Sequence, residues 1–182
     1  MTGTDQRPLA ARGENYDAVG ATRPADAAWP QHPAGFRTFE RTVRIGHGQE
    51  RWQQACSTLF AWGVKTRSGF AVEPAHGAVD RVRPDERYWL VARLGPFAVR
   101  EPVRVVAVVD GPDRCGFAYG TLEGHPVSGE EAFILHRTPD DVVWLTLRSL
   151  TRAPRGRWRP AFPAALLAQR CYRRRYLRAL NG

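Results

Sequence analysis

Residues 116–133 read GFAYGTLEGHPVSGEEAF, and this stretch decides the fold because it combines two strand-like segments with a turn rich in glycine and proline. Side chains alternate along a strand, so Phe117 and Tyr119 share one face of the first segment. The opposite face carries only glycine, alanine and glycine, at positions 116, 118 and 120. Such a bare strip of backbone lets a ligand or another segment approach closely, or it lies on the convex outside of a sheet.

The turn between the two segments carries a candidate catalytic histidine. His125 stands immediately before Pro126, whose ring pushes the backbone of His125 toward an extended conformation. A loop stiffened in this way can hold an imidazole over the mouth of a cavity, where it acts as a general acid or base near neutral pH. The alternative is an exposed histidine with no role in chemistry.

Two adjacent glutamates open the second segment, and strand alternation allows only one of them to face the core. Glu131 shares its phase with Phe133 and Leu135, the bulkier apolar set, so we expect Glu131 to point inward. A buried carboxylate must be paired, hydrogen-bonded or protonated. It serves either as a catalytic acid or base or as a structural partner of an arginine. The candidate catalytic residues are Glu131, His125 and, as a hydrogen-bond donor, Tyr119.

The sequence on either side of this stretch predicts a sheet with helices at its two ends. Residues 36–45 alternate as a strand, and residues 50–62 have helical spacing. A run of strands separated by turn signals follows, at 68–73, 77–83, 87–94, 97–109, 114–122, 130–137 and 142–151. Prolines then lead into a last helix at 162–180.

Strands in a run, with helices segregated to the ends, predict an α+β domain. We expect a curved antiparallel sheet wrapped around the long C-terminal helix, a helix-grip arrangement, with a short helix after the first strand. Folds of this shape offer room for a ligand cavity between the helix and the sheet. The expected organisation is a disordered arm over 1–14, an extended strap over 15–35 and a single α+β domain over 36–182.

The last helix carries arginines within its apolar stripe. At about 100° per residue, Arg170 and Arg173 fall among the apolar residues of this stripe, which are Phe162, Leu166, Leu177 and Leu180. An arginine there meets a carboxylate or a bound anion, or it snorkels with its stem packed and its head in water. In the first case, one of the two faces Glu131 across the space between helix and sheet. The candidate ligand-binding residues are Arg170, Arg173, Phe117, Phe133 and Trp144.

Positive charge is concentrated at the C-terminal end of the chain. The net charge is +9, and nine arginines with no aspartate or glutamate lie between 151 and 182. Such a block attracts nucleic acid, an anionic surface or an acidic group on a small ligand. The alternative is a solvated basic surface, because Lys65 is the only lysine and the chain uses arginine throughout.

Other features of the sequence bear on the cellular location of the protein and on whether it binds a metal or a cofactor. The N-terminal segment lacks a hydrophobic stretch of the signal-peptide type, and no apolar run approaches the roughly 18 residues that span a bilayer. A cytoplasmic location is therefore expected. Cys56, Cys115 and Cys171 fit neither a disulfide framework nor a metal site, and we expect buried thiols. The histidines lack metal-binding spacing and no cofactor motif is present, so neither a metal nor a cofactor is expected.

Four segments resemble uncharacterised protein family 0548, a domain-of-unknown-function family of bacteria and plants. They are YDAVGAT (16–22), GFRTFERTVRIGHGQERWQQA (35–55), the stretch at 116–133 and QRCYRRRYLRAL (169–180). The resemblance covers roughly residues 15 to 180, and it implies no established activity. The family usually has Ser-Arg-Pro after the last strand, whereas this chain has Leu-Thr-Arg-Ala-Pro at 150–154. The element order suggests a relation to the START-like helix-grip group.

Two functions of different classes are consistent with these features. The first is a helix-grip protein that binds a small, largely apolar molecule, either with or without an acidic group. Such a protein can also be a cofactor-free enzyme for cyclisation, isomerisation or dehydration by general acid–base chemistry. The second is a nucleic-acid or anionic-surface binding module, in which the arginines from Arg152 to Arg178 contact phosphates beside Trp158, Tyr172 and Tyr176.

Overall fold

The computed structural model describes residues 7–78, 80–94 and 97–181, which form a seven-stranded antiparallel sheet in the order β1-β7-β6-β5-β4-β3-β2. Strands that are consecutive in the sequence are neighbours from β2 to β7, and β1 pairs with β7 at the far edge. The strands are β1 (Arg37–His47), β2 (Phe70–Pro74), β3 (Arg87–Leu94), β4 (Phe97–Asp110), β5 (Arg114–Thr121), β6 (Ser128–Arg137) and β7 (Val142–Arg152).

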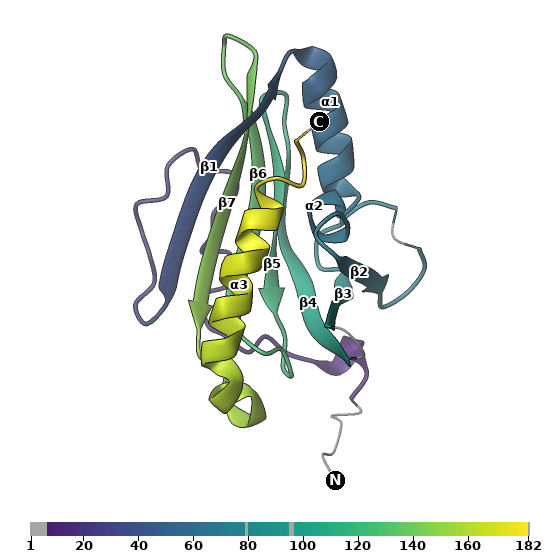
Figure 1. Ribbon diagram of the computed structural model, residues 1–182, viewed down its shortest axis with the longest axis vertical. Helices are drawn as coiled ribbons and strands as arrows, with labels where there is room; N and C mark the ends of the chain where they lie inside the picture. Colours follow the sequence, from purple (N-terminus) through teal and green to yellow (C-terminus); the bar gives the residue numbers. More distant parts are fainter. Residues whose placement is uncertain (1–6, 79, 95–96, 182) are drawn as a thin grey trace.

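The helices lie at the two ends of this run of strands, as the sequence predicts. Helices α1 (Gln49–Phe60) and α2 (Gly63–Thr66) connect β1 to β2, and α3 (Phe162–Tyr176) follows β7 after the short 3-10 helix η2 (Gly156–Ala161). Helix α3 runs along the same face of the sheet as α1 (Figure 1). The predicted fold class, an α+β helix-grip arrangement with a curved antiparallel sheet, is confirmed.

Two element boundaries differ from the prediction. The predicted strand at 77–83 is wrong, because the described residues of this range form no strand. The backbone N–H of Val82 instead donates to the carbonyl of Phe60 at 2.8 Å, and Val82 is buried against the end of α1. The last helix ends at Tyr176, and residues 177–180 form turns.

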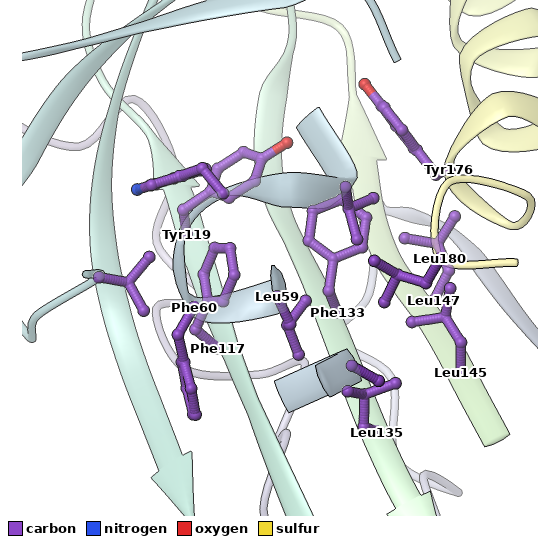
Figure 2. Packing of buried hydrophobic residues seen from close by; sticks show 14 of the residues in the cluster. Leu59, Phe60, Phe117, Tyr119, Phe133, Leu135, Leu145, Leu147, Tyr176 and Leu180 are labelled. Atoms are coloured by element: carbon purple, nitrogen blue, oxygen red, sulfur yellow. The ribbon is translucent and has the colours of Figure 1, made fainter. Parts of the chain in front are cut away.

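The concave face of the sheet forms the main hydrophobic core. Alternate residues of the central strands, such as Phe117, Phe133 and Leu147, are fully buried against Leu59 of α1 and Leu180 beyond α3 (Figure 2). Burial of each large apolar side chain contributes about 1.5–3 kcal/mol, so this interface holds the helices on the sheet.

A disulfide links α1 to the sheet. Cys56 of α1 bonds to Cys115 at the start of β5, and Cys171 is exposed on α3. The prediction of three buried thiols is therefore wrong. Strand alternation places Cys115 on the core face. Its pairing with Cys56 also depends on how α1 packs over β5, and the positions of two cysteines 59 residues apart in the sequence do not indicate this packing.

The convex face is covered by the N-terminal segment. Tyr16 and Trp29 are buried there, and the phenol of Tyr16 lies against Gly120, where a Cβ atom would collide with it. The bare strip of β5 therefore accommodates another segment of the chain. Residues 7–14, expected to be disordered, also pack on the fold, because Leu9 is buried and Glu14 forms a β-bridge with Leu122.

Candidate functional site

A cavity of about 260 Å³ lies between the first half of α3 and the concave face of the sheet. On the helix side it is lined by alanines at 161, 164, 165 and 168, whose spacing places them on one helix face. Larger apolar side chains at these positions would fill the space, so the alanines keep the cavity open. Ala164 and Ala168 are also exposed, so the cavity reaches solvent along this part of α3.

A buried ion pair forms part of the cavity wall. The ammonium of Lys65, on α2, donates to a carboxylate oxygen of Glu131 at 2.9 Å and to the phenol oxygen of Tyr176 at 2.7 Å. The phenol of Tyr119 donates to the same oxygen of Glu131. Only 3% of the Lys65 side chain and 10% of the Glu131 side chain are exposed, so each charge depends on the other for compensation.

Aromatic rings complete the surroundings of Lys65. Its ammonium lies 4.3 Å from the ring centre of Tyr176, 4.7 Å from Phe70 and 4.9 Å from Tyr119, distances that allow cation–π attraction. Burial and the nearby carboxylate of Glu131 raise the pKa of both tyrosines well above its ordinary value. Both phenols therefore stay protonated, and in Figure 2 their oxygens point away from the apolar cluster.

A second polar pair lies on the cavity wall, formed by Glu101 of β4 and His125 of the β5–β6 turn. Glu101 shares its strand face with the buried Val103, and the Glu101 oxygen Oε2 is 3.7 Å from His125 Nε2. Burial, opposed by Lys65 and reinforced by Glu131, raises the pKa of Glu101 from 4.5 to about 7. Burial, reinforced by Lys65, lowers the pKa of His125 from 6.5 to about 3, so this imidazole is neutral.

The predicted catalytic residues meet at this cavity. Glu131, His125 and Tyr119 all line its wall, and the inward orientation of Glu131 follows from the strand phase. Glu130 faces the other way, where its carboxylate accepts from the N-terminal segment. The histidine is buried and held by its loop, so the alternative of an exposed loop histidine is wrong.

The predicted ligand-binding residues lie elsewhere. Arg170 is exposed, and Arg173 donates to the hydroxyl of Ser149 at 2.7 Å, so the expected pairing of either arginine with Glu131 is wrong. Phe117 and Phe133 belong to the closed core below the cavity. Trp144 lies on the convex face, stacked on His136 with 6.4 Å between ring centres. It shares the phase of Arg148, which faces the N-terminal segment.

Three residues of the site escaped the sequence interpretation. Lys65 lies on a helix of four residues, which is too short to show helical periodicity. The one feature that distinguishes it in the sequence is that the chain has no other lysine. Glu101 had a usable signal, because it alternates with Val99 and Val103 on β4 and so points inward. Tyr176 enters the sequence interpretation only as part of a nucleic-acid surface.

The residues that the structure describes contain neither a metal-binding cluster nor a membrane-spanning helix. No group of three or more histidines, cysteines, aspartates or glutamates is arranged to hold a metal ion in that part of the chain. No helix in those residues has the length and apolar composition needed to cross a membrane.

The sheet, the long helix and the cavity between them define a helix-grip protein. Two solved structures share this fold. Hypothetical protein jhp0584 from Helicobacter pylori matches with a TM-score of 0.58 and 12% identity, over 84% of this chain and 89% of that one. The crystal structure of Ara h 8.0201 matches with a TM-score of 0.52 and 11% identity, over 81% and 97%. At these identities the likeness concerns the fold alone.

The chain belongs to the family described as domain of unknown function DUF1990, whose model matches residues 15–179. A UPF0548 protein of Deinococcus radiodurans is 34% identical over 171 residues, which is 86% of this chain and 84% of that protein. The UPF0548 protein At2g17695 of Arabidopsis thaliana is 26% identical over 124 residues, 65% of this chain and 58% of that protein. The resemblance to a family of bacteria and plants is thus confirmed.

Proposed function

We propose that this protein binds a small, largely apolar molecule in the cavity between α3 and the concave face of the sheet. The observation that carries the proposal is the composition of the cavity wall. Apolar and aromatic side chains surround a few buried polar groups, among them Lys65, Glu131 and His125. Sites for small molecules have this combination, because apolar walls supply binding energy and a few polar groups fix orientation.

The charges on the wall favour a neutral ligand over an acidic one. Lys65, the cation on this wall, is already paired with Glu131 and hydrogen-bonded to Tyr176. An acidic ligand would compete with Glu131 for the same ammonium and would approach the carboxyl group of Glu101. Bringing an anion out of water without a free cation is costly, so the acidic ligand considered from the sequence is disfavoured.

Acid–base catalysis without a cofactor is supported by one property of the site. The pKa of Glu101 is raised to about 7, so this carboxyl can both give and take a proton near neutral pH. An isomerisation, cyclisation or dehydration of the bound molecule would use such a group. Binding alone requires only the cavity, and catalysis additionally requires Glu101.

The binding proposal is tested by filling the cavity. Ala165→Phe places a ring into the space from α3, whereas Leu167→Phe places the same ring at a position that is 64% exposed. Naphthalene, followed by its own fluorescence, should bind the wild type and Leu167→Phe equally and Ala165→Phe at least tenfold more weakly. Equal binding to all three proteins, or no binding to any, would overturn the proposal.

A second candidate function is supported by the basic surface of α3 and of the turns that follow it. Arg170, Arg174 and Arg178 are exposed, follow one another at intervals of four residues, and pair with no carboxylate in the described part of the chain. Such a row can contact phosphates, and its binding would weaken steeply as salt is raised. Binding of a 20-base-pair DNA or RNA duplex that the triple substitution to glutamine abolishes would support this function over the first.

A further inference from the structure

The ionisable groups of the cavity include a saturated set and an open pair. Glu131 accepts from both Lys65 and Tyr119, and Lys65 also donates to Tyr176, so this set is satisfied by the protein itself. Glu101 is different. Within the residues that the structure describes, its side chain has no hydrogen-bond partner, and His125 Nε2 lies 3.7 Å from Glu101 Oε2, beyond normal hydrogen-bond length.

The loop holds one ring nitrogen of His125 and leaves the other toward Glu101. His125 Nδ1 lies 3.0 Å from the backbone nitrogen of Val127 and 3.1 Å from the carbonyl oxygen of the same residue. In the tautomer whose Nδ1 accepts from the Val127 N–H, the ring proton lies on Nε2. It is Nε2 that faces Glu101. In this tautomer the cavity offers an N–H donor and a carboxyl acceptor 3.7 Å apart, on two different elements.

One chemical group complements this pair. A hydroxyl oxygen accepts one hydrogen bond and donates another, so it can accept from His125 Nε2–H while its own hydrogen points to Glu101 Oε2. A carbonyl could accept from His125 but would leave Glu101 without a donor. An ammonium would meet the N–H of His125 and the nearby charge of Lys65, and a carboxylate would meet Glu101.

We propose, on the basis of the binding function above, that Glu101 and His125 recognise the hydroxyl group of a neutral, largely apolar alcohol or phenol. The apolar body of the ligand lies against the alanines of α3 and Tyr172, and its hydroxyl end lies between the two side chains. The cavity of about 260 Å³ is larger than the roughly 150 Å³ that accepts benzene, so a two-ring molecule is a suitable probe.

Three probes of nearly equal shape separate this recognition from simple cavity binding. 2-Naphthol has the hydroxyl, 2-methoxynaphthalene keeps the oxygen but lacks its hydrogen, and naphthalene lacks both. The wild type at pH 8 should bind 2-naphthol at least tenfold more tightly than the other two, because a hydrogen bond to a buried carboxylate is lost with the hydrogen. Dissociation constants are measured by titrating the fluorescence of each probe.

Variants of Glu101 complete the test. Glu101→Leu should remove the preference for 2-naphthol while leaving naphthalene binding within about twofold, and Glu101→Gln, which keeps an acceptor oxygen, should retain part of it. The matched control is Glu73→Gln, an exposed glutamate on β2 that pairs with Arg100. It should leave all three affinities unchanged.

The possible failures are distinguishable. If the three probes bind the wild type equally, or if Glu101→Leu keeps the preference, hydroxyl recognition is wrong and the cavity remains a binding site. If no probe binds the wild type, the binding function fails together with the inference. Naphthalene binding by Glu101→Leu shows that its cavity is intact, so a misfolded variant cannot pass for a positive result.

Discussion

The ammonium nitrogen of Lys65 lies 2.9 Å from a carboxylate oxygen of Glu131, inside a wall of aromatic rings. Helix α2 supplies the cation and β6 the anion, so the pair joins the helical connection to the centre of the sheet. Removing either partner leaves an uncompensated charge in a region where water cannot replace it. The pair is therefore best understood as a support that keeps the cavity wall in place.

Lys65→Met should lower the free energy of unfolding by about 3–5 kcal/mol, because Glu131 loses its counter-ion. The double variant Lys65→Met/Glu131→Leu should recover most of that loss, since it removes both charges and keeps apolar volume. Urea denaturation measures both values. Arg83→Met, which removes an exposed pair with Asp80, is the control and should cost less than about 1 kcal/mol. A double variant no more stable than the single one would contradict this account.

The carboxyl of Glu101 should make the protein less stable as the pH rises. Its pKa is raised from 4.5 to about 7, so the folded state binds more protons than the unfolded state between these values. Stability then falls with increasing pH across that window, by about 3 kcal/mol for this group. Glu101→Gln cannot titrate, so the difference between its unfolding free energy and that of the wild type should grow in favour of the variant from pH 4.5 to pH 8. A constant difference would refute the assignment.

The buried ring of His125 should make the protein less stable as the pH falls. Burial lowers its pKa from 6.5 to about 3, so the unfolded state binds the proton first as the pH falls. The stability that depends on the neutral ring is present above pH 6.5 and is lost toward pH 3, about 4–5 kcal/mol in all. His125→Gln should flatten this part of the profile, while substitution of the exposed His47 should not. Denaturation midpoints at half-unit pH intervals would show whether the two profiles differ.

Much of the fold could be predicted because strand alternation and turn residues are local signals. The phase of β6 placed Glu131 inward, and the hairpin at 116–133 followed from its glycines and proline. The disulfide between Cys56 and Cys115 could not be predicted, because it depends on where α1 crosses the sheet. An extended strap over 15–35 is expected from the sequence, but the face of the sheet that it covers has no local signal, since Tyr16 and Trp29 lie in a segment without regular structure.

The site was predicted only in part, for reasons specific to each residue. The predicted positions of Arg170 and Arg173 are wrong because the apolar stripe over 162–180 assumes one continuous helix. The α-helix ends at Tyr176, so Leu177 and Leu180 do not continue its apolar stripe. The side facing the cavity consists of alanines, which a search for large apolar residues overlooks. Lys65 reaches Glu131 only because Trp62 takes a left-handed conformation, with φ of 60°, between α1 and α2.

The N-terminal segment should depend on Glu130, the glutamate that faces away from the cavity. Its carboxylate accepts from the phenol of Tyr16 at 2.9 Å, from the backbone N–H of Gly20 at 2.7 Å and from that of Thr22 at 2.9 Å. Glu130→Gln replaces one acceptor oxygen by a donor that faces N–H groups, which leaves buried donors without partners. We expect a loss of about 2–4 kcal/mol in unfolding free energy, since hydrogen bonds to a charged group contribute about 1.5–3 kcal/mol each and partly persist.

Limited proteolysis distinguishes local release of this segment from global destabilisation. In Glu130→Gln, cleavage within residues 15–35 should become at least tenfold faster under conditions where the sheet remains intact by circular dichroism, because the segment opens without unfolding the core. Glu123→Gln is the matched control, an exposed glutamate that pairs with Arg7 at 2.7 Å. It should leave the cleavage rate within about twofold. If Glu130→Gln is cleaved in this segment no faster than Glu123→Gln, the carboxylate does not hold the segment on the convex face, and the contacts of Trp29 and Arg148 carry that role instead.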